Sequence, residues 1–405
     1  MKIVIVSGAF PPASLAEANH ALHLAEALAR SGADVHVLTT QGSVVDGLPF
    51  TVHALMRDWS WRDLPRFARF LRRARPDAIL MIYIGFAYND HPMASFAPTV
   101  AKTVLPGVPF VTQFENAMGV LTSRCPLPAR AVRKLLSLYA GTTDVDYEFG
   151  TLLRDSDRVI VLGARHEARL TRLYPPTARK SVLIPPPPIV RIFRATNGSA
   201  RNTGRDLLRI KSDEFVLTYF GYLYPSKGIE TLLQAFHLVR SRGRRARLVI
   251  AGGIAAHLYE ERAAYVKELE MLATSLGVGE DIVWTGFLPW DSDDASLCLH
   301  AADVCVLPFD DGISLNNSTF AAAATHRLPI ITTRGESIES PFRHNENVVL
   351  CPPRDADALA AAIEALMDGP ELRERLITGV SAMRDEWFSW ERAAARIIGT
   401  LIPSR

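Results

Sequence analysis

The residues best suited to chemistry lie in two polar turns in the second half of the chain. The first turn, residues 221–228, has the sequence Gly-Tyr-Leu-Tyr-Pro-Ser-Lys-Gly and directly precedes a stretch with helical periodicity. A lysine beside a helix N-terminus adds a positive charge to free backbone N–H groups, and this combination suits a diphosphate. A lysine in a turn is more often simply solvated, so Lys227 alone does not establish a phosphate site.

The second turn, residues 310–319, ends in small polar side chains and is followed by four alanines. This pattern predicts the start of a helix with Asn or Ser as its N-cap. Backbone N–H groups near Ser318 and Thr319 would then point away from the end of the preceding strand. On this segment alone, plain helix capping is the simpler explanation.

Polar side chains also follow three apolar runs in the first half of the chain. They are Glu17, Asn19, His20, Asn89, His91, Glu115 and Asn116. Loops at strand ends often carry binding residues, and a carboxylate or histidine there can accept a proton from a hydroxyl group. Each residue taken singly is explained equally well as a cap or a surface residue. Glu115 is the preferred base, because its strand and its neighbour Asn116 place it nearest the expected reaction centre.

These positions depend on a regular alternation of strands and helices. Short apolar runs bounded by Gly and Pro predict buried strands of a parallel sheet. We expect strands at 2–7, 35–39, 78–83, 108–113, 158–162, 181–184, 215–220, 247–251, 282–285, 304–308 and 329–332. Helical spacing is found at 16–31, 229–240, 356–367 and 370–383. The pattern predicts two doubly wound α/β domains with ligands at the carboxyl ends of their strands, joined by the stiff run Pro185–Pro188.

Composition is that of an ordinary globular protein. The 405 residues are 48% hydrophobic and 22% charged, with a formal net charge of +2, so nucleic-acid binding is not expected. The four cysteines show no CxxC spacing and no accompanying histidine cluster, which disfavours a zinc site and a disulfide framework. No apolar stretch reaches about 18 residues, and the chain shows no signal peptide, so we expect a cytoplasmic location.

The segment Trp59–Arg75 is both basic and aromatic. Its arginines interleave with Phe67, Phe70 and Leu71, a pattern typical of a helix lying on anionic lipid. Peripheral contact with the inner face of a membrane is therefore one interpretation. The alternative is a crossover helix that packs on the sheet and turns an arginine-rich face outward.

Several strings along the chain resemble glycosyltransferase family 4. In the second half these are GYLYPSKGIETLLQAF at 221–236, ARLVIAGG at 246–253, VWTGFLP at 283–289 and ADVCVLPF at 302–309. The opening KIVIVSGAFPP resembles the family's N-terminal half, and FSWERAAARII at 388–398 resembles its closing helix. The resemblance covers essentially the whole chain, in the order and spacing of that family.

The resemblance implies a GT-B fold of two facing Rossmann-like doubly wound domains. Residues 1–185 would bind the acceptor, residues 186–385 the nucleotide-sugar donor, and residues 386–405 would form a helix returning to the first domain. The reaction would move a sugar from a nucleotide-diphosphate sugar, by default a UDP-sugar, to a glycan, lipid or small molecule with retention of configuration. No metal or other cofactor is expected, because Lys227 and backbone amides would neutralise the leaving diphosphate.

The resemblance and the polar positions after the predicted strands together give a set of expected site residues. Lys227 and Glu115 would be catalytic, and Gly252, Gly253 and Gly286 would let strand ends approach the nucleotide. The donor-binding residues would be Gly221, Tyr222, Lys227, Gly252, Gly253, Gly286, Phe287, Ser314, Asn316, Asn317, Ser318 and Thr319. The acceptor-binding residues would be Glu17, Asn19, His20, Asn89, His91 and Asn116.

The chain departs from the family where the family has two glutamates, since Ser314 and Ala322 stand there. A branch of the family with the pattern G-x-S-L-R-R-G-S also lacks this pair, and here Asn316 and Asn317 replace its arginines. The chain is then an active member with altered donor contacts. Alternatively it is a catalytically silent GT-B subunit that binds or activates a partner protein. Another enzyme on this fold, such as a nucleotide-sugar epimerase, is disfavoured by the lack of paired carboxylates in the second domain.

Overall fold

The chain forms two compact α/β units. A computed structural model describes residues 1–13, 15–43, 45, 47–116, 149, 151–195, 199–254, 259–289 and 292–402. The first unit contains Met1–Pro186 and Trp390–Arg405, and the second contains Pro187–Ser389. The boundary between them falls inside the run of four prolines. Within the described residues, no helix is both long and apolar enough to cross a membrane.

The first unit is built on a parallel seven-stranded sheet with the order β3-β2-β1-β4-β5-β6-β7. Its strands are β1 (Lys2–Ser7), β2 (Asp34–Thr40), β3 (Thr51–Met56), β4 (Ala78–Tyr83), β5 (Phe110–Phe114), β6 (Arg158–Val161) and β7 (Ser181–Leu183). The helices are α1 (Ala16–Arg30), α2 (Leu64–Ala74), α3 (Ala97–Val104), α5 (Leu152–Asp155), α6 (Ala164–Leu173) and α14 (Trp390–Leu401). Strand β4 is buried throughout, as expected for a central strand with both faces covered.

The second unit is built on a parallel six-stranded sheet with the order β10-β9-β8-β11-β12-β13. Its strands are β8 (Phe215–Phe220), β9 (Ala246–Ala251), β10 (Ile282–Trp284), β11 (Val304–Leu307), β12 (Ile330–Thr333) and β13 (Val349–Cys351). The helices are α7 (Ala200–Leu207), α8 (Ile229–Ser241), α9 (Tyr259–Ser275), α10 (Asp294–Ala301), α11 (Ser318–Thr325), α12 (Ala356–Asp368) and α13 (Pro370–Trp387). The predicted pair of doubly wound α/β domains is therefore confirmed.

Both sheets reverse their strand order at one point. In the first sheet the reversal lies between β1 and β4, and in the second it lies between β8 and β11. Ligands of doubly wound sheets bind outside the carboxyl ends of the strands at such a reversal. The loops that follow these four strands are therefore the first places to look for a site.

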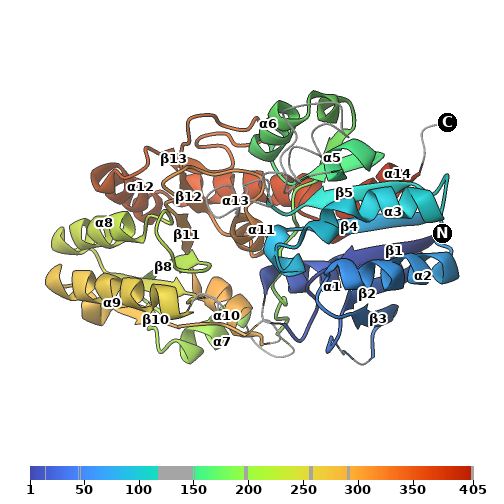
Figure 1. Ribbon diagram of the computed structural model, residues 1–405. Coiled ribbons are helices and arrows are strands. Elements are labelled where there is room, and N and C mark those ends of the chain that lie inside the picture. The colour runs from blue at the N-terminus through green and yellow to red at the C-terminus, as the bar shows by residue number, and fades with distance from the viewer. Residues whose placement is uncertain are drawn as a thin grey trace. The chain divides into compact units, whose positions relative to one another are not determined.

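The last helix, α14, belongs to the first unit. It packs against α1 and contacts β4 and β5, and Figure 1 shows it in red beside the blue and cyan elements of that unit. At its start, the indole ring of Trp390 lies 5.5 Å from the ring of His20 and 5.7 Å from that of His23. The C-terminal helix thus covers one side of a predicted site residue.

Helix α2 shows which interpretation of the basic segment applies. Phe67 and Leu71 are fully buried and Phe70 is 8% exposed, all within the core of the first unit. These apolar side chains pack on the sheet, so the interpretation of a helix that lies on lipid with its aromatic face is wrong. The segment is a crossover helix with arginines on its outer face, and any membrane contact of residues 59–75 would rest on those arginines and on Trp61, which is 46% exposed.

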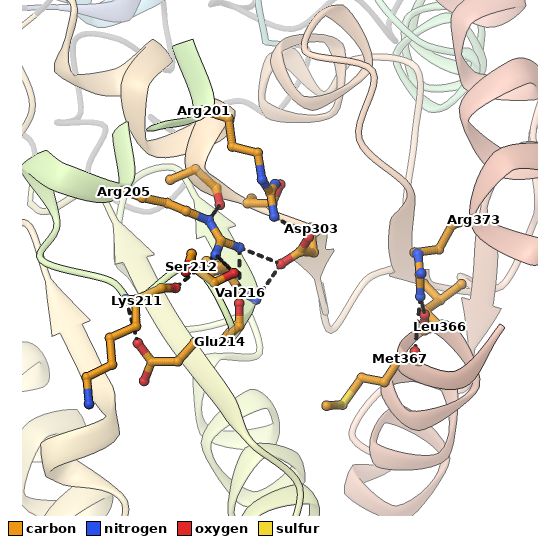
Figure 2. Close-up of polar contacts among 12 residues, drawn as sticks. Arg201, Arg205, Lys211, Ser212, Glu214, Val216, Asp303, Leu366, Met367 and Arg373 are labelled. Atoms are coloured by element: carbon orange, nitrogen blue, oxygen red, sulfur yellow. Dashed lines mark hydrogen bonds and ion pairs between the residues drawn. The ribbon is translucent and has the colours of Figure 1, made fainter. Parts of the chain in front are cut away.

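Arg205 attaches α7 to the second sheet. Its side chain is buried and pairs with Asp303 at 2.9 Å, while Asp303 also accepts a hydrogen bond from the backbone N–H of Val216 at 2.8 Å. Figure 2 shows this network, which Arg201 joins by donating to Asp303 at 2.6 Å. The guanidinium of Arg205 also donates to the carbonyl oxygens of Ala301, Lys211, Ser212 and Glu214. The network therefore joins α7 to the starts of β8 and β11.

Replacing Arg205 should destabilise the protein strongly. We expect Arg205→Met to lower the free energy of unfolding by about 3–5 kcal/mol, because Asp303 and four carbonyls lose a buried partner. The control Arg245→Met removes an ion pair whose two side chains are 81% and 62% exposed, and it should have a much smaller effect. Urea denaturation followed by circular dichroism measures both. Equal losses for the two variants would contradict this account of the network.

Candidate functional site

The loop after β8 lies at the reversal of the second sheet and carries Lys227. It is held to the loop after β11 by a backbone contact: a β-carbon on Gly228, whose φ is +70°, would lie 1.9 Å from the carbonyl oxygen of Pro308. The backbone N–H of Asp310 also donates to the carbonyl oxygen of Ser226 at 3.0 Å. These contacts place the two loops side by side, and α8 begins immediately after Gly228.

The ammonium group of Lys227 lies between two aromatic rings. Its Nζ is 4.7 Å from the ring centroid of Tyr224 and 4.6 Å from that of Phe309. These cation–π contacts orient the side chain without neutralising its charge. In the part of the chain that the structure describes, Lys227 makes no ion pair with a carboxylate. The charge is therefore available to an anionic ligand.

The turn before α11 leaves the first N–H groups of that helix without a side-chain cap. Asn317 occupies the N-cap position, but it makes no capping hydrogen bond, and its Oδ1 instead accepts from Oγ1 of Thr319 at 2.7 Å. Uncapped N–H groups at a helix start attract anions. Ser314 and Asn316 precede the helix, where Oγ of Ser314 accepts from the backbone N–H of Asn316 at 3.2 Å.

Thr319 and Gly221 join the two halves of this site. A β-carbon on Gly221 would lie 2.9 Å from Cγ2 of Thr319, so the start of α11 touches the end of β8. Tyr222 is held in the same loop, because its carbonyl oxygen accepts from the buried hydroxyl of Tyr219 at 2.9 Å. Lys227 and the uncapped turn of α11 thus belong to one continuous surface of the second unit.

The two predicted glycines after β9 pack against neighbouring backbone, whereas the one after β10 does not. A β-carbon on Gly252 would lie 2.0 Å from the carbonyl oxygen of Gly221, and one on Gly253 would lie 2.5 Å from the backbone nitrogen of Phe287. A β-carbon on Gly286 would have no neighbouring atom within 4 Å, so this position faces open space. Phe287 is 42% exposed, which leaves an aromatic ring accessible beside these strand ends.

Two residues of this surface have no counterpart among the sequence-based candidates. A carboxylate oxygen of Glu339 accepts from the backbone N–H of Leu315, so the turn carries a carboxylate although Ser314 and Ala322 replace the family's glutamates. The guanidinium carbon of Arg262, on α9, lies 4.9 Å from the ring centroid of Tyr224, the ring that Lys227 also contacts. Both are distant in sequence from the turns they join, and no local pattern could have identified them.

The first unit brings three of its candidates together around a residue that was not predicted. Nε2 of Gln113 donates to Oε1 of Glu115 at 2.6 Å and lies 2.8 Å from Nε2 of His20. The Gln113 amide nitrogen thus lies between the Glu115 carboxylate and the His20 ring and joins the two. His20 and Glu115 are almost fully buried, and 3.6 Å separates their nearest side-chain atoms.

Glu17 joins this group from the first turn of α1. The pKa of Glu17 is raised from the ordinary value of 4.5 to about 7, chiefly because the group is buried; a hydrogen bond to backbone lowers it, and the negative charge of Glu115 makes a smaller raising contribution. A carboxyl group with such a pKa can exchange a proton near neutral pH. The cluster of Glu17, His20, Gln113 and Glu115 can therefore accept a proton from a hydroxyl and hold it.

The remaining candidates of the first unit have separate surroundings. Asn19 is buried, and its Oδ1 has no hydrogen-bond partner within the described segments. Asn89 donates to the carbonyl oxygen of Asp58 at 3.0 Å, and Nδ1 of His91 accepts from the backbone N–H of Met93 at 3.1 Å. The last two thus stabilise turns after β4. Asn116 directly follows Glu115 in the loop after β5.

Two family models match the chain, and together they span most of it. Residues 201–381 match the family described as glycosyl transferases group 1. Residues 17–187 match the glycosyl transferase 4-like domain. The two matches correspond closely to the second and first units.

Known relatives agree with these matches. A D-inositol 3-phosphate glycosyltransferase of Thermomonospora curvata is 26% identical over 253 residues, which cover 60% of this chain and 56% of that protein. The chain spans about half the length of the curated relatives it matches.

Solved structures share the fold over nearly the whole chain. Sucrose-phosphate synthase of Thermosynechococcus elongatus has a TM-score of 0.70 at 19% identity, with 98% of each chain covered. HepE of Anabaena, in complex with UDP and glucose, has a TM-score of 0.70 at 16% identity, with 99% of each chain covered. At such identities the likeness concerns the fold alone.

The raised pKa of Glu17 predicts that the stability of the folded protein falls as the pH rises. Its folded-state pKa of about 7 lies above the ordinary value of 4.5, so between these values the folded state holds a proton that the unfolded state has lost. Stability from this group is complete below the lower value and is lost as the pH rises through 7. At about 1.4 kcal/mol per pKa unit, Glu17→Gln should remove up to about 3 kcal/mol of this pH dependence.

Urea denaturation at pH 5 and pH 8 tests this expectation. Glu26→Gln, on the same helix, is the control, because the hydrogen bond from His23 lowers the pKa of Glu26 and places its titration below this window. The wild type and Glu26→Gln should lose stability between the two pH values, and Glu17→Gln should lose less. Parallel curves for all three proteins would contradict the assignment.

Proposed function

Since the chain belongs to family 4 of the glycosyltransferases, which adopt the GT-B fold, we propose that it transfers a sugar from a nucleotide-diphosphate sugar to a glycan, lipid or small-molecule acceptor. The second unit binds the donor and the first unit binds the acceptor. The transfer retains the anomeric configuration and uses no metal ion. A UDP-sugar is the first donor to test, because the similar fold of HepE holds UDP and glucose.

The arrangement of Lys227 and the start of α11 at the reversal of the second sheet supports this proposal most strongly. The ammonium of Lys227 and the uncapped start of α11 come from the loops after β8 and β11, and Gly221 contacts Thr319 between them. A positive charge beside free N–H groups stabilises a leaving diphosphate without a metal ion. Capping alone does not account for a helix start whose Asn side chain makes no capping bond.

The proposed reaction assigns one role to each part. The acceptor oxygen forms a bond to the anomeric carbon on the face from which the diphosphate departs, and the bond from that carbon to the phosphate oxygen breaks. The acceptor proton passes to Glu115, whose carboxylate is held by Gln113. The charge that develops on the diphosphate is stabilised by Lys227 and by the N–H groups of residues 317–319.

Aromatic and polar groups near the strand ends would recognise the rest of the donor. Phe287 is exposed directly after β10 and is suited to contact the base. Ser314 and Asn316 would contact the sugar from the turn before α11. The carboxylate of Glu339, from the loop after β12, accepts a hydrogen bond from that same turn, which favours an active enzyme with altered donor contacts over a silent subunit.

Binding of nucleoside diphosphates tests the donor site. Isothermal titration of UDP, GDP, ADP, dTDP and CDP should identify one ligand that binds tightly. Lys227→Ala should weaken that ligand roughly ten-fold or more, which corresponds to about 1.4 kcal/mol. Lys211→Ala removes an exposed lysine of the same unit and should leave the affinity within about two-fold.

Turnover of the matching sugar nucleotide then distinguishes an active enzyme from a silent subunit. An active enzyme releases the diphosphate from the matching sugar nucleotide when an acceptor is supplied, and nuclear magnetic resonance of the product shows the donor's anomeric configuration. Failure of the wild type to bind any of the five nucleotides would contradict the donor site. Tight binding without turnover would favour the silent subunit, for which affinity capture of a partner protein is the next experiment.

A further inference from the structure

A second candidate binding site lies at the other end of the first unit. An open cavity of about 530 Å³ lies between α2 and the outer strands β2 and β3. Its nitrogen-bearing lining residues are Lys2, His36, His53, Arg66, Arg69 and Arg73. Pockets for small molecules typically measure about 300–1,000 Å³. Lys2 opens β1 and Ala74 closes α2, so the cavity lies away from the carboxyl-end cluster of Glu17 and Glu115.

Helix periodicity and sheet register bring these groups together. Arg66, Arg69 and Arg73 fall at helical spacing on one side of α2, while Phe67 and Leu71 on the other side enter the core. His36 and His53 lie on neighbouring strands with their rings stacked at 5.2 Å, and 3.0 Å separates Nδ1 of the first from Nε2 of the second. The cavity is thus lined by arginines from α2 and by a histidine pair from β2 and β3.

The cavity keeps an excess of positive charge. Three carboxylates approach it: Asp34 lies 4.0 Å from Lys2 and 3.2 Å from His36, Asp63 pairs with Arg66, and Asp77 accepts from the backbone N–H of Lys2. Arg69 and Arg73, by contrast, form no ion pair within the residues the structure describes. Burial lowers the pKa of His53, and the neighbouring His36 and Lys2 lower it further, which agrees with a positive potential inside.

We propose that this cavity binds a phosphomonoester, either a free metabolite or the headgroup of a lipid. Guanidinium groups one turn apart match phosphate oxygens with paired N–H donors, and Lys2 adds a point charge. The wall also contains apolar surface from Leu55, Phe70 and Ala74. A ligand with a carbon skeleton attached to its phosphate would contact both kinds of surface.

Two probes and two matched double variants test the proposal. Glycerol 3-phosphate supplies a free phosphomonoester for isothermal titration, and phosphatidylcholine vesicles containing phosphatidic acid supply the same group on a lipid. Arg69→Gln with Arg73→Gln removes two charges from the cavity. Arg62→Gln with Arg72→Gln removes two charges from exposed neighbours that do not line it. Leu55→Glu is a further variant, which places a carboxylate in the wall from an exposed position.

The expected result is a loss of at least ten-fold in affinity for Arg69→Gln with Arg73→Gln and for Leu55→Glu, and a change below about two-fold for the control pair. This pattern with glycerol 3-phosphate identifies a free ligand. The same pattern only with phosphatidic acid vesicles identifies a lipid headgroup. Equal losses in the two double variants, or no binding of either probe to the wild type, would overturn the proposal. The Lys227 loop is unchanged in every variant, so its own phosphate binding does not contribute to the differences.

Discussion

A backbone contact between two loops determines the arrangement of the second unit's site. Gly228 lies so close to the carbonyl oxygen of Pro308 that any β-carbon there would overlap it. Lys227 directly precedes this contact and Phe309 directly follows it, so the contact brings the lysine ammonium over the aromatic ring. The reversal of strand order between β8 and β11 is what allows the two loops to meet, since their crossovers leave toward opposite sides. Sheet topology and one glycine thus define where the proposed phosphate site lies.

The first unit uses the same device at its own reversal. A β-carbon on Gly8, after β1, would lie 2.3 Å from the carbonyl oxygen of Ala87, after β4. Here, however, the groups that gather nearby are acidic, with Glu17 on α1 and Glu115 after β5. The two units therefore share a plan and differ in charge. The second unit carries a lysine and free N–H groups, which suit an anion, and the first unit carries carboxylates, which suit a hydroxyl group.

The sequence predicted the buried central strands and the polar turns that follow them, because both depend on local patterns. It did not predict β3, because residues Thr51–Met56 are mostly half-buried or exposed at the edge of the sheet and form no continuous apolar run. Nor did it predict Gln113, Arg262 or Glu339 as site residues. Each joins its cluster through tertiary contacts. The glutamate pair of the family is absent from the sequence, but only the structure shows that Glu339 brings a carboxylate to the same turn.

Hydrogen–deuterium exchange with and without the tightest-binding nucleoside diphosphate tests most directly whether the turns after β8 and β11 form one phosphate site. We expect slower exchange at the amides of residues 222–228 and 317–320 together, and no change in α12 and α13. Slower exchange in only one of the two turns, or in neither, would contradict a single site built from both.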